Sequence, residues 1–333
     1  MIKVALVGAG KMGVSHLSIL GAHPDVEVVG VCDTSKVVTN FLERYSKLDC
    51  FADFAKMLDN AKPDAVFVAV PTKFHHQIIK LAMEKNIHVF AEKPFCLNTA
   101  EGTELIELAA RKNLVNQVGY HNKFVGTFKE VKRIVQSGML GEVYHFVAES
   151  YGPVVTKAKQ SSWRSKPEEG GGCLMDYASH VIDLVNDIIS PINQVKGATL
   201  KSIYSNTVED AVYSVMNTTS NVSGILSVNW SEETYRKMST TVTILGSKGK
   251  IISDANELKL YLKDETKDYT KGWNVKYITD LTDQVNFNLR GEEYSAQIDY
   301  FIDAVMKRKP NTVNTFHQAW QTDKVIELIK QHR

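Results

Sequence analysis

The sequence has few cysteines, and their spacing suggests no special chemistry. Its 333 residues include four, Cys32, Cys50, Cys96 and Cys173, which form no CxxC pair. This pattern argues against a disulfide framework and against a cysteine zinc site, so we expect reduced thiols in a reducing compartment. The histidines, aspartates and glutamates show no metal-ligand spacing either, and we predict no metal site.

The sequence also lacks a large net charge and long apolar runs. The 39 Lys and Arg residues balance 38 Asp and Glu residues to +1, so no general attraction to nucleic acid or to a membrane surface is expected. No apolar run approaches the ~18 residues that a membrane-spanning helix needs. The chain enters a strand pattern directly, without a charged and then apolar leader. We therefore expect a cytoplasmic protein, and its length predicts two domains.

Residues 1–122 alternate between strand and helix patterns. Short runs rich in β-branched residues predict strands at residues 2–7, 26–32, 65–70, 87–91 and 115–119. Longer stretches between them predict helices at residues 12–20, 35–45, 75–85 and 99–111. Continuous apolar strands separated by helices are typical of a parallel sheet covered on both faces. We predict an α/β domain with a Rossmann-type, doubly wound parallel sheet.

Residues 123–333 follow a different pattern. After a predicted helix at 126–137, strand patterns follow one another at residues 143–151, 198–204, 211–218, 224–230, 240–245, 250–253 and 258–262. Further helices are predicted at residues 174–189, 294–306 and 316–330. Period-two alternation within residues 224–230 is typical of a sheet with one wetter face. We predict an α+β domain with a large, mainly antiparallel open sheet and with its last two helices free to pack back on the first domain.

A glycine-rich loop, Gly8-Ala9-Gly10-Lys11-Met12-Gly13, lies between the first predicted strand and helix. In such a loop the first glycine permits a tight turn, the second lets backbone approach a pyrophosphate, and the third lets helix and strand pack closely. Asp33 lies 20 residues after Gly13, where a carboxylate accepts hydrogen bonds from a ribose diol and repels a 2′-phosphate. We predict NAD as the cofactor; Lys36 nearby leaves NADP as the less favoured choice. A helix cap before Ser35 is the alternative role for Asp33.

Two more strand ends carry candidate residues. Glu92-Lys93-Pro94 lies at the carboxyl edge of the predicted sheet, where α/β sheets bind ligands. Lys93 either polarises a substrate hydroxyl or is an ordinary surface lysine. Pro71-Thr72 with His75 either lines the cofactor ribose or forms a strand-to-helix turn that Thr72 caps.

A third candidate group follows Gly170-Gly171-Gly172. On a helix over residues 174–189, Asp176 and His180 are neighbours on a polar stripe, opposite an apolar one. A histidine there suits proton transfer near neutral pH, and the aspartate either keeps the imidazole basic or binds a substrate hydroxyl. The alternative is a solvated helix face with an ordinary ion pair. Trp163-Arg164, just upstream, either contacts a ligand or is structural.

These motifs, taken in order, resemble the Gfo/Idh/MocA (glucose–fructose oxidoreductase, inositol dehydrogenase and rhizopine-catabolism) family of NAD(P)-dependent sugar oxidoreductases. The likeness runs nearly end to end. It includes the motifs above and further runs: Gly119-Tyr120-His121-Asn122-Lys123-Phe124, Asp183, Glu209-Asp210-Ala211 and Trp230. Two positions depart from the family pattern. Ala178 stands where glycine is frequent, and Lys123 stands where arginine is frequent, which puts a bidentate contact in doubt.

The resemblance implies roles for particular residues. Lys93 would contact the substrate hydroxyl, Asp176 would position the sugar, and His180 would be the general base. Cofactor contacts are implied for Gly8, Gly10, Lys11, Met12, Asp33, Pro71, Thr72, His75, Glu92 and Lys93. Substrate contacts are expected for Tyr120, Asn122, Lys123, Trp163, Arg164 and Asp176.

We therefore expect an NAD-dependent oxidoreductase that transfers a hydride between nicotinamide and a secondary hydroxyl or ketone of a sugar, sugar derivative or nucleotide sugar. The alternatives are a cyclitol dehydrogenase, a keto-sugar reductase and, in another class, a non-catalytic dinucleotide-binding regulator. Loss of the lysine or histidine would indicate the regulator, and Lys93, Asp176 and His180 are all present.

The second predicted sheet also suggests self-association. Its seven predicted strands offer more area than the helices can cover, and members of the resembled family pair through this sheet. Candidates for a face that needs a partner are Tyr213, Val215, Leu226, Val228, Val242 and Ile244. We predict a homodimer or homotetramer formed through the C-terminal sheet.

Overall fold

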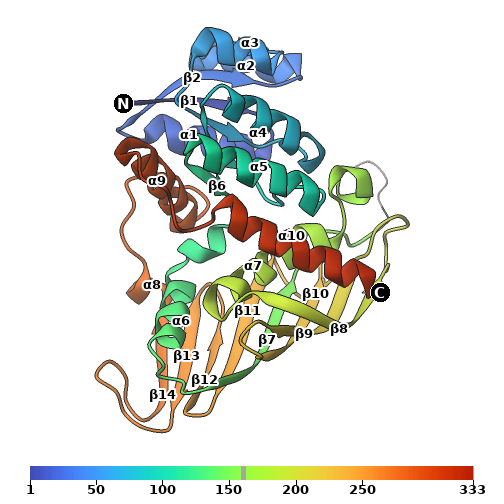
Figure 1. Ribbon diagram of the computed structural model, residues 1–333, viewed down its shortest axis with the longest axis vertical. Coiled ribbons are helices and arrows are strands. Elements are labelled where there is room, and N and C mark those ends of the chain that lie inside the picture. The colour runs from blue at the N-terminus through green and yellow to red at the C-terminus, as the bar shows by residue number, and fades with distance from the viewer. Residues whose placement is uncertain (159–162, 333) are drawn as a thin grey trace. The chain divides into compact units, whose positions relative to one another are not determined.

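The computed structural model describes residues 1–158 and 163–332, which form two compact units (Figure 1). Unit 1 comprises Met1–His121 and Gln284–Trp320, and unit 2 comprises Asn122–Asp283 and Gln321–Arg333. The first boundary lies one residue before the one drawn from the sequence. The C-terminal region is divided between the units, because residues 284–320 pack with the first sheet.

Unit 1 contains a parallel sheet with the strand order β3-β2-β1-β4-β5-β6. Its strands are β1 (Ile2–Val7), β2 (Val26–Cys32), β3 (Cys50–Phe51), β4 (Ala65–Val68), β5 (His88–Ala91) and β6 (Asn116–Val118). This is the order of a doubly wound dinucleotide-binding fold, so the predicted fold class of this part is confirmed. The sequence patterns missed β3, which has only two residues.

Two apolar clusters cover the two faces of this sheet. Val4 and Leu6 of β1 face one cluster, whereas Ala5 and Val7 face the other, as the period of two requires. The first face is covered by α1 (Lys11–Ala22), α2 (Lys36–Ser46) and α9 (Glu292–Lys307). The second is covered by α3 (Phe54–Ala61), α4 (His75–Glu84), α5 (Thr99–Lys112) and the start of α10 (Phe316–Gln331). Residues 294–319 therefore complete the core of unit 1.

Unit 2 contains an eight-stranded sheet, counted over the described residues, in the order β14-β13-β12-β11-β7-β10-β9-β8. Its strands are β7 (Val143–Tyr151), β8 (Ile192–Lys201), β9 (Ala211–Thr218), β10 (Ser223–Asn229), β11 (Ser239–Gly246), β12 (Gly249–Ser253), β13 (Glu257–Leu262) and β14 (Gly272–Tyr277). Among the described strand pairs of this second sheet, only β7 and β10 are parallel. The prediction of a mainly antiparallel sheet is confirmed. The sequence patterns missed β14. They placed the start of β8 six residues too late, at residue 198 instead of Ile192.

Helices cover one face of the second sheet. They are α6 (Gly126–Gln136) and α7 (Ser179–Ile188), and a short helix α8 (Ile278–Leu281) follows β14. Leu226 and Val228 of β10 are at most 1% exposed, because they lie on this covered face. Val215 of β9 pairs with Ile225 of β10 on the opposite face, and both are at least 41% exposed.

The expected set of partner-seeking residues therefore mixed the two faces. Tyr213 and Val215 lie on the open face, but Leu226, Val228, Val242 and Ile244 are core residues, and that part of the prediction was wrong. The reason is that adjacent residues of a strand point to opposite faces, and period alone does not say which face is covered.

Throughout residues 1–158 and 163–332, no helix combines the length and the apolar character needed to cross a membrane.

Candidate active site

The three glycines of the loop between β1 and α1 meet different constraints. Gly8 has φ +88°, and a Cβ atom there would lie 2.5 Å from the Ala69 carbonyl oxygen. A Cβ atom at Gly13 would lie 1.8 Å from the Gly8 carbonyl oxygen. Internal packing therefore requires glycine at both positions. Gly10 differs, because nothing in the described chain lies within 4 Å of a Cβ placed there. The protein's own packing leaves Gly10 open, as expected where a ligand approaches.

The start of α1 fits an anionic group. Gly10 is the N-cap, no side chain caps the helix within the described residues, and the first turn holds no acidic residue. Its first N–H groups and the exposed Lys11 thus favour a phosphate. Asp33 accepts hydrogen bonds from the N–H groups of Ala9 (2.7 Å) and Ser35 (2.8 Å). The carboxylate therefore ties the loop to the turn before α2, and its remaining lone pairs can accept a ribose diol.

His75 is an internal brace. Its ring is 1% exposed, and its Nδ1 and Nε2 atoms lie 3.1 Å and 3.0 Å from the carbonyl oxygens of Phe95 and Val70. Burial lowers the pKa of His75 although these carbonyl groups oppose the shift. Both ring nitrogens face protein carbonyl groups, and the contact of His75 with the cofactor stays a prediction. Thr72 opens a short 3-10 turn (Thr72–Phe74) and is 4% exposed.

Glu92 and Lys93 follow β5 at the carboxyl edge of the first sheet, and the Lys93–Pro94 peptide bond is cis. Glu92 Oε1 lies 2.6 Å from Nε2 of His16 in α1, and Oε2 accepts the Lys93 N–H at 3.3 Å. Burial alone would raise the pKa of Glu92. The hydrogen bond from His16 and the electrostatic interactions with His16, Lys93 and His121 outweigh burial, so the pKa of Glu92 lies below its ordinary value.

Further groups gather around Glu92 within unit 1. The His121 ring stacks on Tyr294 with centroids 4.6 Å apart, and the Arg290 guanidinium lies 5.3 Å from the Tyr294 centroid. Burial lowers the pKa of His121 to about 4, so this ring is neutral near pH 7. Burial, together with the charge of Glu92, raises the pKa of Tyr294 to about 12. No motif pointed to Arg290 and Tyr294, because only the fold brings them from far along the chain to this group.

In unit 2, Asp176 lies in a π-helical turn, Leu174–Ala178, that precedes α7. One continuous α-helix over 174–189 was expected, and that prediction was wrong at its first turn. The Glu209 carboxylate accepts the Leu174 N–H at 2.8 Å. A Cβ atom at Gly172, where φ is +107°, would lie 2.4 Å from Glu209 Oε1. This close approach fixes the start of the turn, and such π turns are frequent at functional sites.

Arg164 holds the Asp176 carboxylate. Its Nε donates to Asp176 Oδ2 at 2.9 Å, and its guanidinium lies 4.7 Å from the centroid of the Trp163 ring. The Asp176 side chain is 6% exposed and that of Arg164 is 38% exposed. The Trp163-Arg164 pair thus has a structural role, and its contact with substrate stays a prediction.

The polar stripe of α7 is buried. His180 is 4% exposed and Asp183 is 1% exposed, so the alternative of a solvated helix face is wrong. Asp183 Oδ1 accepts a hydrogen bond from Lys123 Nζ at 2.8 Å. Burial raises the pKa of Asp183 to about 6 even though Lys123 opposes the shift. The structure thus pairs the Lys123 ammonium group with Asp183, and the contact of Lys123 with substrate stays a prediction.

Two other expected substrate residues are nearly enclosed. Tyr120 is 1% exposed and belongs to the apolar core of unit 1, and its contact with substrate stays a prediction. Asn122 is 5% exposed, and its contact with substrate stays a prediction.

In the described part of the chain, no group of three or more His, Cys, Asp or Glu side chains is arranged to hold a metal ion.

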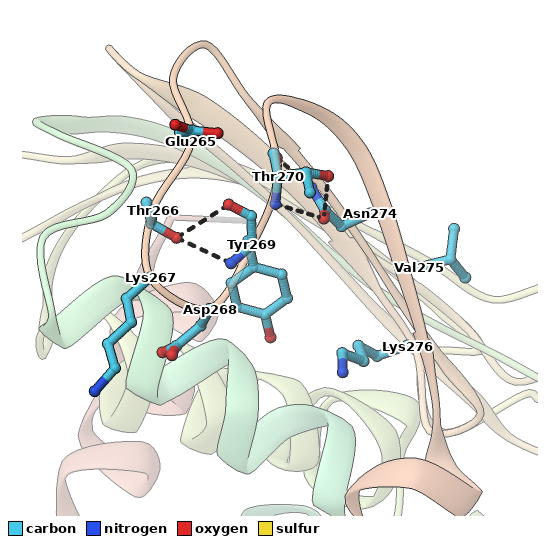
Figure 2. A pocket seen from close by; sticks show the side chains of 9 residues that line it. All are labelled: Glu265, Thr266, Lys267, Asp268, Tyr269, Thr270, Asn274, Val275 and Lys276. Carbon is cyan, nitrogen blue, oxygen red and sulfur yellow. Dashed lines mark hydrogen bonds between the residues drawn. The ribbon is translucent and has the colours of Figure 1, made fainter.

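Figure 2 shows the side chains that line a hollow beside the β13–β14 hairpin. The volume of this hollow is about 320 Å³. Hydrogen bonds join Tyr269 to Thr266 and Thr270 to Asn274. The Tyr269 hydroxyl donates to Glu130. None of the candidate catalytic residues lines this hollow. The site must therefore be assigned from the chemistry of the side chains.

Comparison with known families decides the affiliation. The model described as "Oxidoreductase family, NAD-binding Rossmann fold" matches residues 2–120, and "GFO/IDH/MocA C-terminal domain" matches residues 128–252. The chain belongs to the Gfo/Idh/MocA oxidoreductase family. The resemblance drawn from the motifs is confirmed, and so is the NAD-binding Rossmann domain.

Among curated Gfo/Idh/MocA relatives, D-glucoside 3-dehydrogenase of Escherichia coli K12 is 29% identical over 187 residues, 55% of this chain and 52% of that enzyme. Myo-inositol 2-dehydrogenase of Thermotoga maritima is 23% identical over 274 residues, 80% of each chain. The chain spans about half the length of three of the curated relatives that it matches.

Solved structures of the same fold include two with NADH. Levoglucosan dehydrogenase with NADH and levoglucosan superposes with a TM-score of 0.89 at 19% identity, over 99% of this chain and 96% of that one. The WlbA dehydrogenase of Bordetella pertussis, with NADH and UDP-GlcNAcA, gives 0.83 at 20% identity, over 99% and 95%. These identities establish a shared fold.

Proposed function

We propose that this protein is an NAD-dependent dehydrogenase that interconverts a secondary hydroxyl group and a ketone on a sugar-type substrate. The observation that carries the proposal is the burial of Asp176, 5% exposed on the turn that Glu209 holds, and of His180, 4% exposed in the first turn of α7. Polar groups are costly to bury, and a merely structural turn would not need a histidine beside a carboxylate there. The NAD-binding unit supplies the second half of the chemistry.

The chain's own residues divide the work. Gly10, Lys11 and Met12 would hold the pyrophosphate at the start of α1, and Asp33 would bind the adenosine ribose. Bound NAD supplies the acceptor for the hydride that leaves the carbinol carbon. His180 would take the hydroxyl proton, so that the carbon loses a hydride, the oxygen loses a proton, and a ketone remains. Lys93 would polarise that oxygen, and Asp176 would bind a neighbouring hydroxyl.

The substrate class follows from these groups and from the relatives' names. Asp176 and the Arg164 that holds it are suited to a polyol with several hydroxyl groups. The relatives named above act on a D-glucoside and on myo-inositol. We therefore propose a sugar, a sugar derivative or a nucleotide sugar, with a cyclitol or a keto-sugar as the alternatives. Asp33 favours NAD over NADP, because a carboxylate repels a 2′-phosphate.

A substrate screen tests the proposal directly. Free sugars, cyclitols and nucleotide sugars would be incubated with NAD and with NADP, and their keto forms with NADH, while absorbance of the reduced cofactor is recorded. Turnover of at least one polyol is expected. Tight NADH binding in calorimetry without turnover of any compound in either direction would instead indicate a dinucleotide-binding regulator.

We also propose that the protein forms a homodimer or homotetramer through the open face of its second sheet. That face exposes large apolar side chains on β9 and β10 and on β13 and β14: Tyr213, Val215, Ile225, Tyr261, Trp273, Val275 and Tyr277. Large apolar side chains exposed on one face of a sheet are typical of an interface. A mass near 37.3 kDa in light scattering at micromolar concentration would contradict this proposal.

We also propose a reducing, cytoplasmic location, which the four free cysteines support.

A further inference from the structure

His16 is an unusual residue for its place in the fold. It lies on the buried stripe of α1 with Gly13, Ile19 and Leu20, and it is 0% exposed. Its ring packs against Phe67 at 5.8 Å and against the edge of Phe90 at 5.3 Å. An apolar residue would fill this position without the cost of burying a polar ring. The imidazole must therefore be present for the contact that it makes.

That contact is the one with Glu92. Nε2 of His16 lies 2.6 Å from Glu92 Oε1, whereas Nδ1 has no hydrogen-bond partner in the described chain. A doubly protonated ring would leave the Nδ1 proton buried without an acceptor, which is costly. The neutral ring with its proton on Nε2 avoids this cost and donates to the carboxylate. The geometry thus selects one tautomer and makes His16 a donor to Glu92.

Glu92 in turn contacts the backbone of Lys93. With Oε1 held by His16, Oε2 faces the Lys93 N–H at 3.3 Å. The other charged or titratable groups that act on Glu92 are the side chains of Lys93 and His121, and Glu92 in turn acts on His75 and Tyr294. His16 approaches from α1, the helix whose first turn carries the glycine loop. One side chain therefore connects the phosphate-binding helix with the end of β5.

We propose that His16 is a positioning residue for Lys93 and acts through Glu92. The donor on Nε2 fixes the carboxylate, and the fixed carboxylate holds the turn that carries Lys93. The proposal rests on the proposed dehydrogenase function, since it assigns His16 to that reaction. It adds a residue that is three positions beyond the glycine loop and that no dinucleotide contact would require.

The test compares three variants of the full-length protein. His16→Leu keeps the apolar packing and removes the donor, and His16→Gln restores an amide donor at a similar reach. Ile19→Val, a buried change on the same helix without a polar contact, is the matched control. Turnover would be measured with the most active compound of the substrate screen, and NADH binding by fluorescence.

We expect His16→Leu to lower kcat by about 10- to 100-fold, as misplaced catalytic groups do, with NADH affinity within about twofold of wild type. The acid limb of the kcat profile should move to higher pH, because Glu92 without its donor binds a proton more readily. His16→Gln should recover most of the loss. A His16→Leu enzyme with the kcat and pH profile of Ile19→Val would overturn the proposal.

A second measurement separates this proposal from the proposed function. Nitrogen chemical shifts of the histidine rings in the cofactor-free protein report the tautomer of each ring. We expect His16 to carry its proton on Nε2 and to change when Glu92→Gln is introduced. If no compound of the screen is turned over, the dehydrogenase function fails, and these shifts alone decide the contact. A proton on Nδ1 of His16 would overturn its role as donor to Glu92.

Discussion

Removal of the Lys123 ammonium group should lower the unfolding free energy of unit 2 by more than a substitution at the surface does. Lys123 Nζ and Asp183 Oδ1 lie 2.8 Å apart, and their side chains are 2% and 1% exposed. At an effective dielectric constant of about 20, two unit charges at this distance attract by roughly 6 kcal/mol. Desolvation of both ions offsets much of this attraction. Lys123→Met leaves the carboxylate buried without its cation, which costs about 3–5 kcal/mol of unfolding free energy at pH 8.

The pH dependence of this loss follows from Asp183. Burial raises the pKa of this carboxyl from 3.8 to about 6, even with Lys123 present. A carboxyl with a raised folded-state pKa stabilises the folded protein below its unfolded pKa, and this contribution is lost as pH rises through the folded value. Without Lys123 the folded pKa rises further, so the loss occurs above about pH 6. The destabilisation by Lys123→Met should therefore be largest at pH 8 and should shrink at pH 5.

Urea unfolding, followed by far-UV circular dichroism at pH 5 and pH 8, measures both effects. The double variant Lys123→Met, Asp183→Leu should regain much of the stability at pH 8, since no buried charge remains. Lys132→Met is the matched control, because the Lys132–Asp187 pair lies one turn along α7 and its lysine is 32% exposed. It should cost roughly 1 kcal/mol. A loss for Lys123→Met that is equal at both pH values, or a double variant no more stable than the single, would refute this reasoning.

Four further substitutions test the candidate site. His180→Ala should lower kcat by roughly 10²–10⁴-fold with unchanged NADH affinity in calorimetry, and an active variant with the wild-type pH profile would remove His180 as the base. Gly10→Ala should keep the melting temperature, because its Cβ meets nothing within 4 Å of the described chain, yet weaken NADH binding. Gly13→Ala should instead lower the melting temperature, since its Cβ would lie 1.8 Å from the Gly8 oxygen. Asp33→Ser should narrow the ratio of kcat/KM between NAD and NADP, and an unchanged ratio would contradict its role in cofactor choice.

Local sequence patterns were enough to predict the elements and the fold class. The apolar runs at residues 2–7 and 26–32 coincide with β1 and β2, and the glycine loop lies between β1 and α1 as expected. Short-range periodicity determines these features, because each element's pattern is complete within its own residues. Two strands were not predicted from these patterns. β3 has two residues, and β14 (Gly272–Tyr277) alternates only between partly and well exposed positions.

The candidate site could be predicted only as a set of residue types at strand and helix ends. Lys93, Asp176 and His180 were found by their motifs, and their roles remain proposals. The contacts that hold them were not predictable. His16 was not predicted as a functional residue, although a histidine between Gly13 and Ile19 on the apolar stripe of a helix is a signal that could have pointed to it. Glu209 and Arg164 hold the Asp176 turn from other segments.

The sequence by itself thus determined which elements form, how they alternate, and where a phosphate-binding turn lies, because these depend on neighbours within a few residues. The tertiary structure alone decided which polar groups meet and which sheet face is covered. His16 and Glu92 are 76 residues apart, and Lys123 and Asp183 are 60 apart. Such pairs form because packed helices and strands bring distant residues within hydrogen-bonding distance, and no periodic pattern within one element records its partner in another.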